Sequence, residues 1–130
     1  MDEIKLFENF ASGVIAHLKK DEDACEIEWS PHPTFPGVYL KHLVRGNDTN
    51  GKLSCHLVKI GSGHSIGEHL HEGKMELHEV IQGRGQCVME DKSITYEPGV
   101  VAVIPADVVH EVKAGAEELR LFAKFVPALL

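Results

Sequence analysis

The stretch GHSIGEHLHEGKMELHEVIQG, residues 63–83, decides how this chain folds. Its two central histidines, His69 and His71, are two residues apart, and a β-strand would place both imidazoles on one face. Residues 72–74, Glu-Gly-Lys, favour a turn after which Glu76 opens a second strand beside the histidines. The stretch therefore predicts two consecutive strands that bring two imidazoles and one carboxylate together.

These three side chains form a set of donors that suits a transition metal. Two neutral nitrogen atoms and one anionic oxygen favour a borderline divalent ion such as iron, manganese, nickel, cobalt or zinc. Calcium and magnesium prefer sites made of oxygen atoms alone. We therefore expect one divalent transition metal ion as the cofactor, and the donors do not select one of the five metals.

After Gly37 the sequence consists of short runs of strand-forming residues separated by glycine, proline, asparagine and aspartate. We expect eight strands, at Val38–Val44, Leu53–Ile60, Met75–Ile81, Gln86–Met89, Ser93–Tyr96, Val100–Ile104, Val108–Val112 and Leu119–Val126. Eight short strands in about ninety residues are typical of a closed all-β sandwich or barrel. With 130 residues the chain suits a single domain.

The beginning of the chain has a different spacing of apolar residues. We expect residues 1–36 to form a segment that packs on a barrel of residues 37–130. Between Ile4 and Leu18 the apolar residues recur at three- and four-residue steps, as on one face of a helix, but Gly13 weakens that prediction. A short helix and an extended segment along the barrel are both open. Prolines then restrict the chain to a loop or a sheet edge, at Pro31, Pro33 and Pro36.

The composition narrows the range of partners. Thirteen basic and twenty acidic residues leave a net charge of −7, which repels nucleic-acid phosphates and anionic lipids. No apolar run approaches the roughly 18 residues that a membrane span needs. The N-terminus lacks the basic start and apolar block of a secretory signal. We expect a cytoplasmic protein whose partner is a small molecule rather than nucleic acid or a membrane.

A second group of residues extends the pattern further along the chain. In order, the two groups are Gly63, five residues, His69-x-His71, four residues, Glu76, six residues and Gly83, followed by Gly99, five residues, Pro105, four residues and His110. This order resembles the two motifs of the cupin superfamily, and the chain is similar to its small, single-domain, RmlC-like members. Asp107 stands where cupins usually have glycine and Ala114 where they usually have asparagine. Neither is a ligand, and aspartate tolerates the turn conformations that glycine provides.

The resemblance implies both a fold and a fourth ligand. Cupins are double-stranded β-helix, or jelly-roll, barrels of two facing antiparallel sheets, in which the two motifs form adjacent strands. The implied metal ligands are His69, His71, Glu76 and His110, the quartet. Alternatively, the histidines are half-exposed polar residues and the barrel holds no ion. We favour metal binding because cupins that lost their metal usually lost at least one of the four ligands.

Two further histidines are candidates for the lining of a substrate pocket. His78 is two residues beyond Glu76 and should face the same interior, where it could position substrate, move a proton or act only as a hydrogen-bonded lining residue. His56 alternates with Ser54 and Val58, so it should also face inward. No residue is singled out as catalytic.

A divalent ion held by three imidazoles and one carboxylate would keep about one positive charge and, in octahedral geometry, two open positions. We expect a metal-dependent enzyme that acts on a small, oxygen-rich metabolite, and we favour oxygen-dependent cleavage by a dioxygenase. The alternatives are a non-catalytic binding or sensor module and a non-oxidative isomerase, lyase or decarboxylase. A storage or structural barrel is least favoured, since every ligand is present.

The C-terminus, residues 119–130, carries a surplus of large apolar side chains. Small cupin barrels often pair through an outer sheet face or exchanged terminal strands. We therefore expect a homodimer, in which a second copy buries this surplus.

Overall fold

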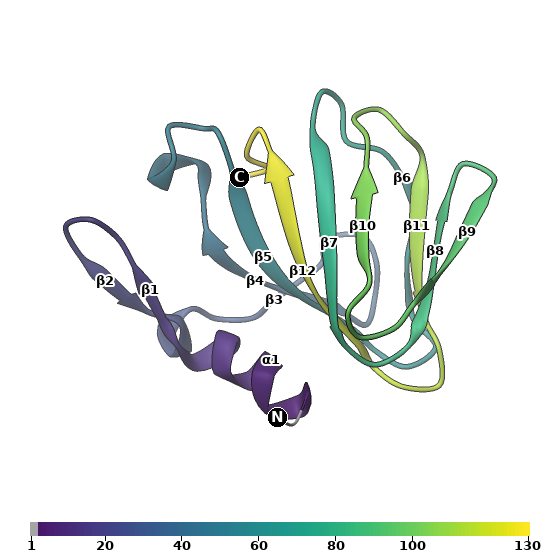
Figure 1. Ribbon diagram of the computed structural model, residues 1–130, viewed down its shortest axis with the longest axis horizontal. Helices are drawn as coiled ribbons and strands as arrows, with labels where there is room; N and C mark the ends of the chain where they lie inside the picture. Colours follow the sequence, from purple (N-terminus) through teal and green to yellow (C-terminus); the bar gives the residue numbers. More distant parts are fainter. Residues whose placement is uncertain (1–2) are drawn as a thin grey trace.

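The computed structural model describes residues 3–130, so Met1 and Asp2 of the expected N-terminal segment lie outside the described residues. The elements are α1 (Glu3–Ser12), β1 (Val14–Ala16), β2 (Asp21–Asp23), the 3-10 turn η1 (Ala24–Glu26), β3 (Ser30–Pro31), β4 (Val38–Val44), the 3-10 turn η2 (Gly46–Asp48), β5 (Ser54–Ile60), β6 (Ser65–His69), β7 (Met75–Gln82), β8 (Gly85–Met89), β9 (Lys92–Tyr96), β10 (Val101–Ile104), β11 (His110–Ala114) and β12 (Leu119–Val126). Two antiparallel sheets, ordered β10-β7-β12-β5-β4-β3 and β6-β11-β8-β9, face each other (Figure 1). The expected all-β jelly-roll barrel with a short N-terminal helix is confirmed.

All eight expected strands are present, with ends that differ from the prediction by at most two residues, but one strand of the barrel, β6, was missed. β6 was not among the expected runs, although the spacing of His69 and His71 had placed both on one strand. That placement is wrong for His71, because β6 ends at His69 and the chain leaves the sheet at Leu70 to turn at residues 72–73. The two imidazoles still come together, since the chain turns back only after His71.

The N-terminal segment contains both structures that the sequence left open. α1 ends at Ser12 rather than continuing to Leu18, and β1 then pairs with β2 in a hairpin. The helix ends before Gly13 because glycine has low helix propensity and the β-branched Val14 and Ile15 favour a strand. β3 is the edge strand of the larger sheet, as the prolines predicted. Within residues 3–130, no helix has the length and apolar character needed to cross a membrane.

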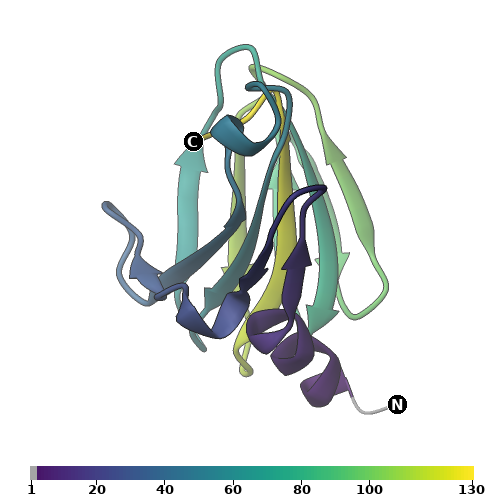
Figure 2. The ribbon, with the colours of Figure 1, turned by 90° about the vertical axis from the view of Figure 1, so that its left-hand side faces the viewer.

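α1 and the β1–β2 hairpin lie on the outer side of the six-stranded sheet (Figure 2). Phe7 and Ala11 of α1 are buried in one cluster with Leu57 of β5. Lys41 of β4 connects the segment to the sheet, since its Nζ donates to the carbonyl oxygens of Ala11 at 2.7 Å and Ala24 at 2.8 Å. With only 4% of its surface exposed, Lys41 holds the end of α1 and the start of η1 against the sheet.

The main core lies between the two sheets. It is built from alternate residues of the strands, and β12 contributes Leu119, Leu121, Ala123 and Phe125, all buried. The apolar surplus of the C-terminus, on which the expected homodimer rests, is therefore largely buried within one chain. The homodimer stays a prediction.

Candidate metal centre

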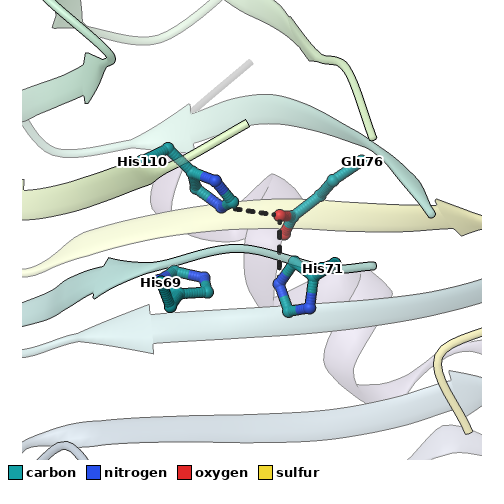
Figure 3. Close-up of side chains that lie close together, drawn as sticks. All are labelled: His69, His71, Glu76 and His110. Atoms are coloured by element: carbon teal, nitrogen blue, oxygen red, sulfur yellow. Dashed lines mark hydrogen bonds and ion pairs between the residues drawn. The ribbon is translucent and has the colours of Figure 1, made fainter. Parts of the chain in front are cut away.

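The quartet is assembled from both sheets and from the connection between them (Figure 3). His69 ends β6 and His110 begins β11, and the two residues lie directly opposite each other in the antiparallel pairing. Glu76 is the second residue of β7, in the facing sheet. His71 lies between β6 and β7. The structure thus brings together all four residues that the sequence predicted as ligands.

The four side chains are close enough to share one ion. One ligand atom from each residue can be chosen so that all lie within 4.8 Å of one another. Oε1 of Glu76 is 3.1 Å from Nε2 of His110 and 3.6 Å from Nε2 of His71. The ring centroids of His69 and His110 are 4.2 Å apart. A single small cation could therefore contact all four side chains.

Backbone carbonyl groups orient two of the imidazoles. Nδ1 of His69 donates to the carbonyl oxygen of Gly67 at 2.7 Å, and Nδ1 of His110 donates to that of Val108 at 2.9 Å. A neutral imidazole that donates through Nδ1 keeps its lone pair on Nε2. His69 therefore presents Nε2 as a ligand atom, and His110 would present Nε2 once a bound cation replaces the proton that it donates to Glu76, in the arrangement typical of metal-binding histidines.

The charges at the centre follow from burial and from close contacts. Burial lowers the pKa of His69 and of His71, so both stay neutral near pH 7. Burial alone would raise the pKa of Glu76, but His78 and His110 outweigh it and bring that pKa well below its usual range. Burial likewise opposes protonation of His110, but the hydrogen bonds to Glu76 and to a backbone carbonyl outweigh it and raise the pKa of His110. The result is an ionised carboxylate among imidazoles, although Glu76 is only 5% exposed.

A divalent cation fits this set of residues. Among residues 3–130, the ion pairs of Glu76 all involve histidines, namely His71, His78 and His110, rather than a permanently charged lysine or arginine. A buried carboxylate needs compensating positive charge. A proton on His110 supplies part of that charge, and a bound cation would replace the proton. Three imidazole nitrogens and one carboxylate oxygen are ligands that borderline divalent ions prefer.

His78 lies two residues beyond Glu76, and both of its ring nitrogens have partners. Nε2 is 2.7 Å from Oε2 of Glu76, and Nδ1 is 2.7 Å from the hydroxyl of Tyr96. The residue is 2% exposed. A direct contact between His78 and substrate stays a prediction, and the ring has no free nitrogen for it. Tyr96 was missed from the sequence, where nothing connects a tyrosine of β9 with a strand of the facing sheet.

His56 belongs to a separate chain of hydrogen bonds inside the barrel. The N–H of Leu129 donates to Oγ of Ser54 at 2.9 Å, Oγ lies 2.8 Å from Nε2 of His56, and Nδ1 of His56 lies 2.7 Å from Nδ1 of His42. A neutral His56 ring carries one N–H, so it donates to one of these two neighbours and accepts from the other. Burial lowers the pKa of His56 to about 4, so the ring is neutral. A role of His56 in substrate binding stays a prediction.

Two aromatic rings flank the accessible side of the quartet. His69 and His71 are half-buried while the other two ligands are buried, so the centre opens to solvent past these two histidines. The ring centroid of Phe35 is 6.2 Å from that of His69, and that of Phe125 is 4.9 Å from that of His71. Phe35 comes from the proline-containing loop, which the sequence had not connected with the site.

Two features outside the barrel do not belong to this centre. A groove of about 870 Å³ between α1, β1 and the outer face of the larger sheet is lined by none of the quartet. His17, Glu22 and Asp48 also lie close together, but Nζ of Lys20 is 3.5 Å from Oε1 of Glu22 and repels a cation there.

Comparison with known proteins identifies the family. The family model described as the cupin domain matches residues 56–125, more than half of the chain and all of the quartet. The chain therefore belongs to the cupin family, which confirms the resemblance found in its two motifs. No curated protein sequence matches the chain significantly.

Solved structures agree with this assignment. A protein from Thermotoga maritima described as a predicted oxalate decarboxylase matches with a TM-score of 0.73 and 23% identity, over 79% of this chain and 95% of that one. KdgF from Halomonas sp. matches with a TM-score of 0.69 and 23% identity, over 79% of this chain and 88% of that one. An RmlC-like cupin from Shewanella frigidimarina matches with a TM-score of 0.72 and 16% identity, over 89% of this chain and 95% of that one. At these identities the likeness shows the shared barrel alone.

Proposed function

We propose that the quartet binds one divalent transition metal ion and that the chain is a metal-dependent enzyme for a small, oxygen-rich molecule such as a carboxylate or an enol. The convergence of three imidazoles and one carboxylate, with ligand atoms within 4.8 Å of one another, carries the proposal. When bound, iron, manganese, nickel, cobalt or zinc supplies Lewis acidity and open positions for oxygen ligands.

The surroundings of the quartet favour a small anionic substrate. A charge of +2 on the ion and −1 on Glu76 leaves a net charge of about +1 at the centre. The rings of Phe35 and Phe125 next to His69 and His71 supply apolar walls that limit access of water. We therefore expect a substrate whose oxygen atoms are held at the centre and whose carbon skeleton contacts these rings.

The reaction class has two candidates. Oxygen-dependent cleavage, a dioxygenase reaction, is the first. A non-oxidative reaction such as decarboxylation, elimination or isomerisation is the second, and the description of the Thermotoga maritima protein as a predicted oxalate decarboxylase favours it. A binding module that returns its ligand unchanged is the alternative to both.

Metal analysis of the purified chain tests the first part of the proposal. We expect about one equivalent of metal per chain in the wild type and a loss of most of it in H110A and in E76A. The control is H64Q, because His64 is an exposed histidine outside the quartet. Equal metal content in wild type, H110A and E76A would rule out the quartet as the site.

Turnover assays test the second part. Metal-loaded protein is incubated with a panel of small carboxylates and enols, in air and without oxygen, and products and oxygen uptake are measured. Product only in air supports the dioxygenase, and equal product in both supports a non-oxidative enzyme. Tight binding in calorimetry without turnover of any compound would establish a binding module instead.

A homodimer is also part of the proposal. β10 is an edge strand of the larger sheet, and its outward residues Val101 and Val103 are 59% and 55% exposed. An exposed apolar edge strand can pair with a second chain. Light scattering at micromolar concentration should give twice the chain mass of 14.3 kDa, and a mass of one chain would reject the dimer.

A further inference from the structure

The carboxylate of Glu76 has its two oxygen atoms in different surroundings. Oε1 lies 3.1 Å from Nε2 of His110 and 3.6 Å from Nε2 of His71, on the side of the other ligands. Oε2 lies 2.7 Å from Nε2 of His78, which is not a member of the quartet. One oxygen of the carboxylate therefore faces the proposed metal centre, and the other faces His78.

The directions of the hydrogen bonds behind Glu76 follow from the chemistry of the groups. An ionised carboxylate only accepts, so His78 donates to Oε2 through Nε2–H. Nδ1 of His78 is then free to accept from the hydroxyl of Tyr96, 2.7 Å away. Burial raises the pKa of Tyr96, so the hydroxyl keeps the proton that it donates. One continuous chain of hydrogen bonds runs from Tyr96 through His78 to Glu76.

This chain has fixed anchor points. His78 lies on β7 with Glu76, whereas Tyr96 ends β9 in the facing sheet, so the hydrogen bonds cross the interior from one sheet to the other. His78 is 2% exposed and Tyr96 is fully buried. Water does not compete for these groups, and a buried polar group that loses its hydrogen-bond partner destabilises the protein. The His78 ring is thereby held in one position and one tautomer.

We propose that His78, held by Tyr96, is a positioning residue that occupies Oε2 of Glu76 and so presents the carboxylate to the metal through Oε1 alone. The inference rests on the proposed metal site. A carboxylate ligand that uses one oxygen leaves a coordination position open which a chelating carboxylate would fill. His78 thus keeps a position free for substrate without touching the substrate.

Metal titrations of matched variants test this role. H78L removes the donor to Oε2 at similar volume, H78Q keeps an N–H donor on a flexible chain, and Y96F removes only the hydroxyl that holds the ring. The affinity for Zn²⁺ is measured by competition with a chromophoric chelator, and the coordination by the visible absorption of the Co²⁺-loaded proteins. Circular dichroism checks that each variant is folded.

We expect H78L to bind Zn²⁺ about 10- to 100-fold more weakly than the wild type, as is typical when a partner of a metal ligand is lost. H78Q should recover most of this loss, and Y96F should weaken binding about 3- to 10-fold, in line with the loss of one buried hydrogen bond. The Co²⁺ spectrum of H78L should change in intensity as Oε2 also becomes a ligand. A merely structural role of His78 would not alter that spectrum.

The results separate this inference from the proposed function. Wild-type affinity and an unchanged Co²⁺ spectrum in H78L would overturn the positioning role and leave the metal site intact. If H78L does not fold, Y96F decides, and unchanged affinity and spectrum in Y96F would overturn the role. A wild type that binds neither Zn²⁺ nor Co²⁺ would overturn the metal site and the positioning role together.

Discussion

Oδ1 of Asp107 accepts a hydrogen bond from the backbone N–H of Gly73 at 3.0 Å, and so ties the turn before His110 to the turn after His71. The backbone N–H of Asp107 also donates to the carbonyl oxygen of His71 at 3.2 Å. Asp107 has a φ of 68°, in the left-handed region where cupins usually place glycine. The expectation that aspartate tolerates this turn is confirmed, and its side chain adds a contact that glycine lacks.

Substitutions of Asp107 should separate these two contributions. D107A loses the hydrogen bond and places alanine in the left-handed region, so we expect the free energy of unfolding to fall by about 1–3 kcal/mol. D107N keeps an oxygen acceptor and tolerates this conformation, so it should stay within about 0.5 kcal/mol of the wild type. Urea unfolding monitored by fluorescence measures both. Equal stability of D107A and D107N would contradict this account.

The two glycines of the first motif should respond differently to alanine. Gly63 and Gly83 have φ values of 74° and 85°, so alanine is strained at either position. A Cβ at Gly63 would meet open space, but one at Gly83 would overlap the backbone of Glu118. We expect a loss of about 1–2 kcal/mol for G63A and more than about 3 kcal/mol for G83A, measured by urea unfolding. Similar losses for both would show that the contact with Glu118 relaxes easily.

Lys41 should be important for attachment of the N-terminal segment. K41M keeps an apolar stem but leaves the buried carbonyl groups of Ala11 and Ala24 without their donor, so we expect a loss of about 2–4 kcal/mol. Hydrogen exchange should increase most in α1. The matched control is K59M, because Nζ of Lys59 lies 4.1 Å from the Trp29 ring centroid but the residue is only half-buried. Comparable losses in both variants would exclude a special role for Lys41.

His56 should make the metal-free protein sensitive to acid. Its pKa falls from 6.5 to about 4 on folding, so below pH 6.5 the unfolded chain binds a proton that the folded chain does not. The contribution of neutral His56 is complete above pH 6.5 and is lost as the pH falls toward 4. Between pH 7 and 4.5 the loss should be about 2–3 kcal/mol, measured by urea unfolding.

The variant H56Q isolates this contribution from those of other titrating groups. Its free energy of unfolding should be lower at pH 7 but should depend less on pH by about 2–3 kcal/mol over the same range. A pH dependence identical to that of the wild type would show that His56 does not titrate with a lowered pKa.

Much of the barrel and the convergence of the quartet could be predicted from the sequence. Strand periodicity and turn formers placed most strands, the spacing of His69, His71 and Glu76 indicated three ligands that converge, and the resemblance to cupins implied His110 as the fourth. Such signals are local, because side-chain direction along a strand and the conformation of a turn depend on neighbouring residues. The beginning of the chain, by contrast, was left open between a helix and an extended segment, and the structure has a helix up to Ser12 followed by a hairpin.

Only the tertiary structure decided which groups form hydrogen bonds with Glu76 and with the other buried side chains of the interior. The contacts of His78 with Tyr96 and of His56 with His42 depend on the register of strands and on the way in which the two sheets face each other. The sequence by itself determined the kinds of donor and their order along the chain. Their partners were decided by long-range packing, because a hydrogen bond about 3 Å long requires two residues distant in sequence to meet to within a fraction of an ångström.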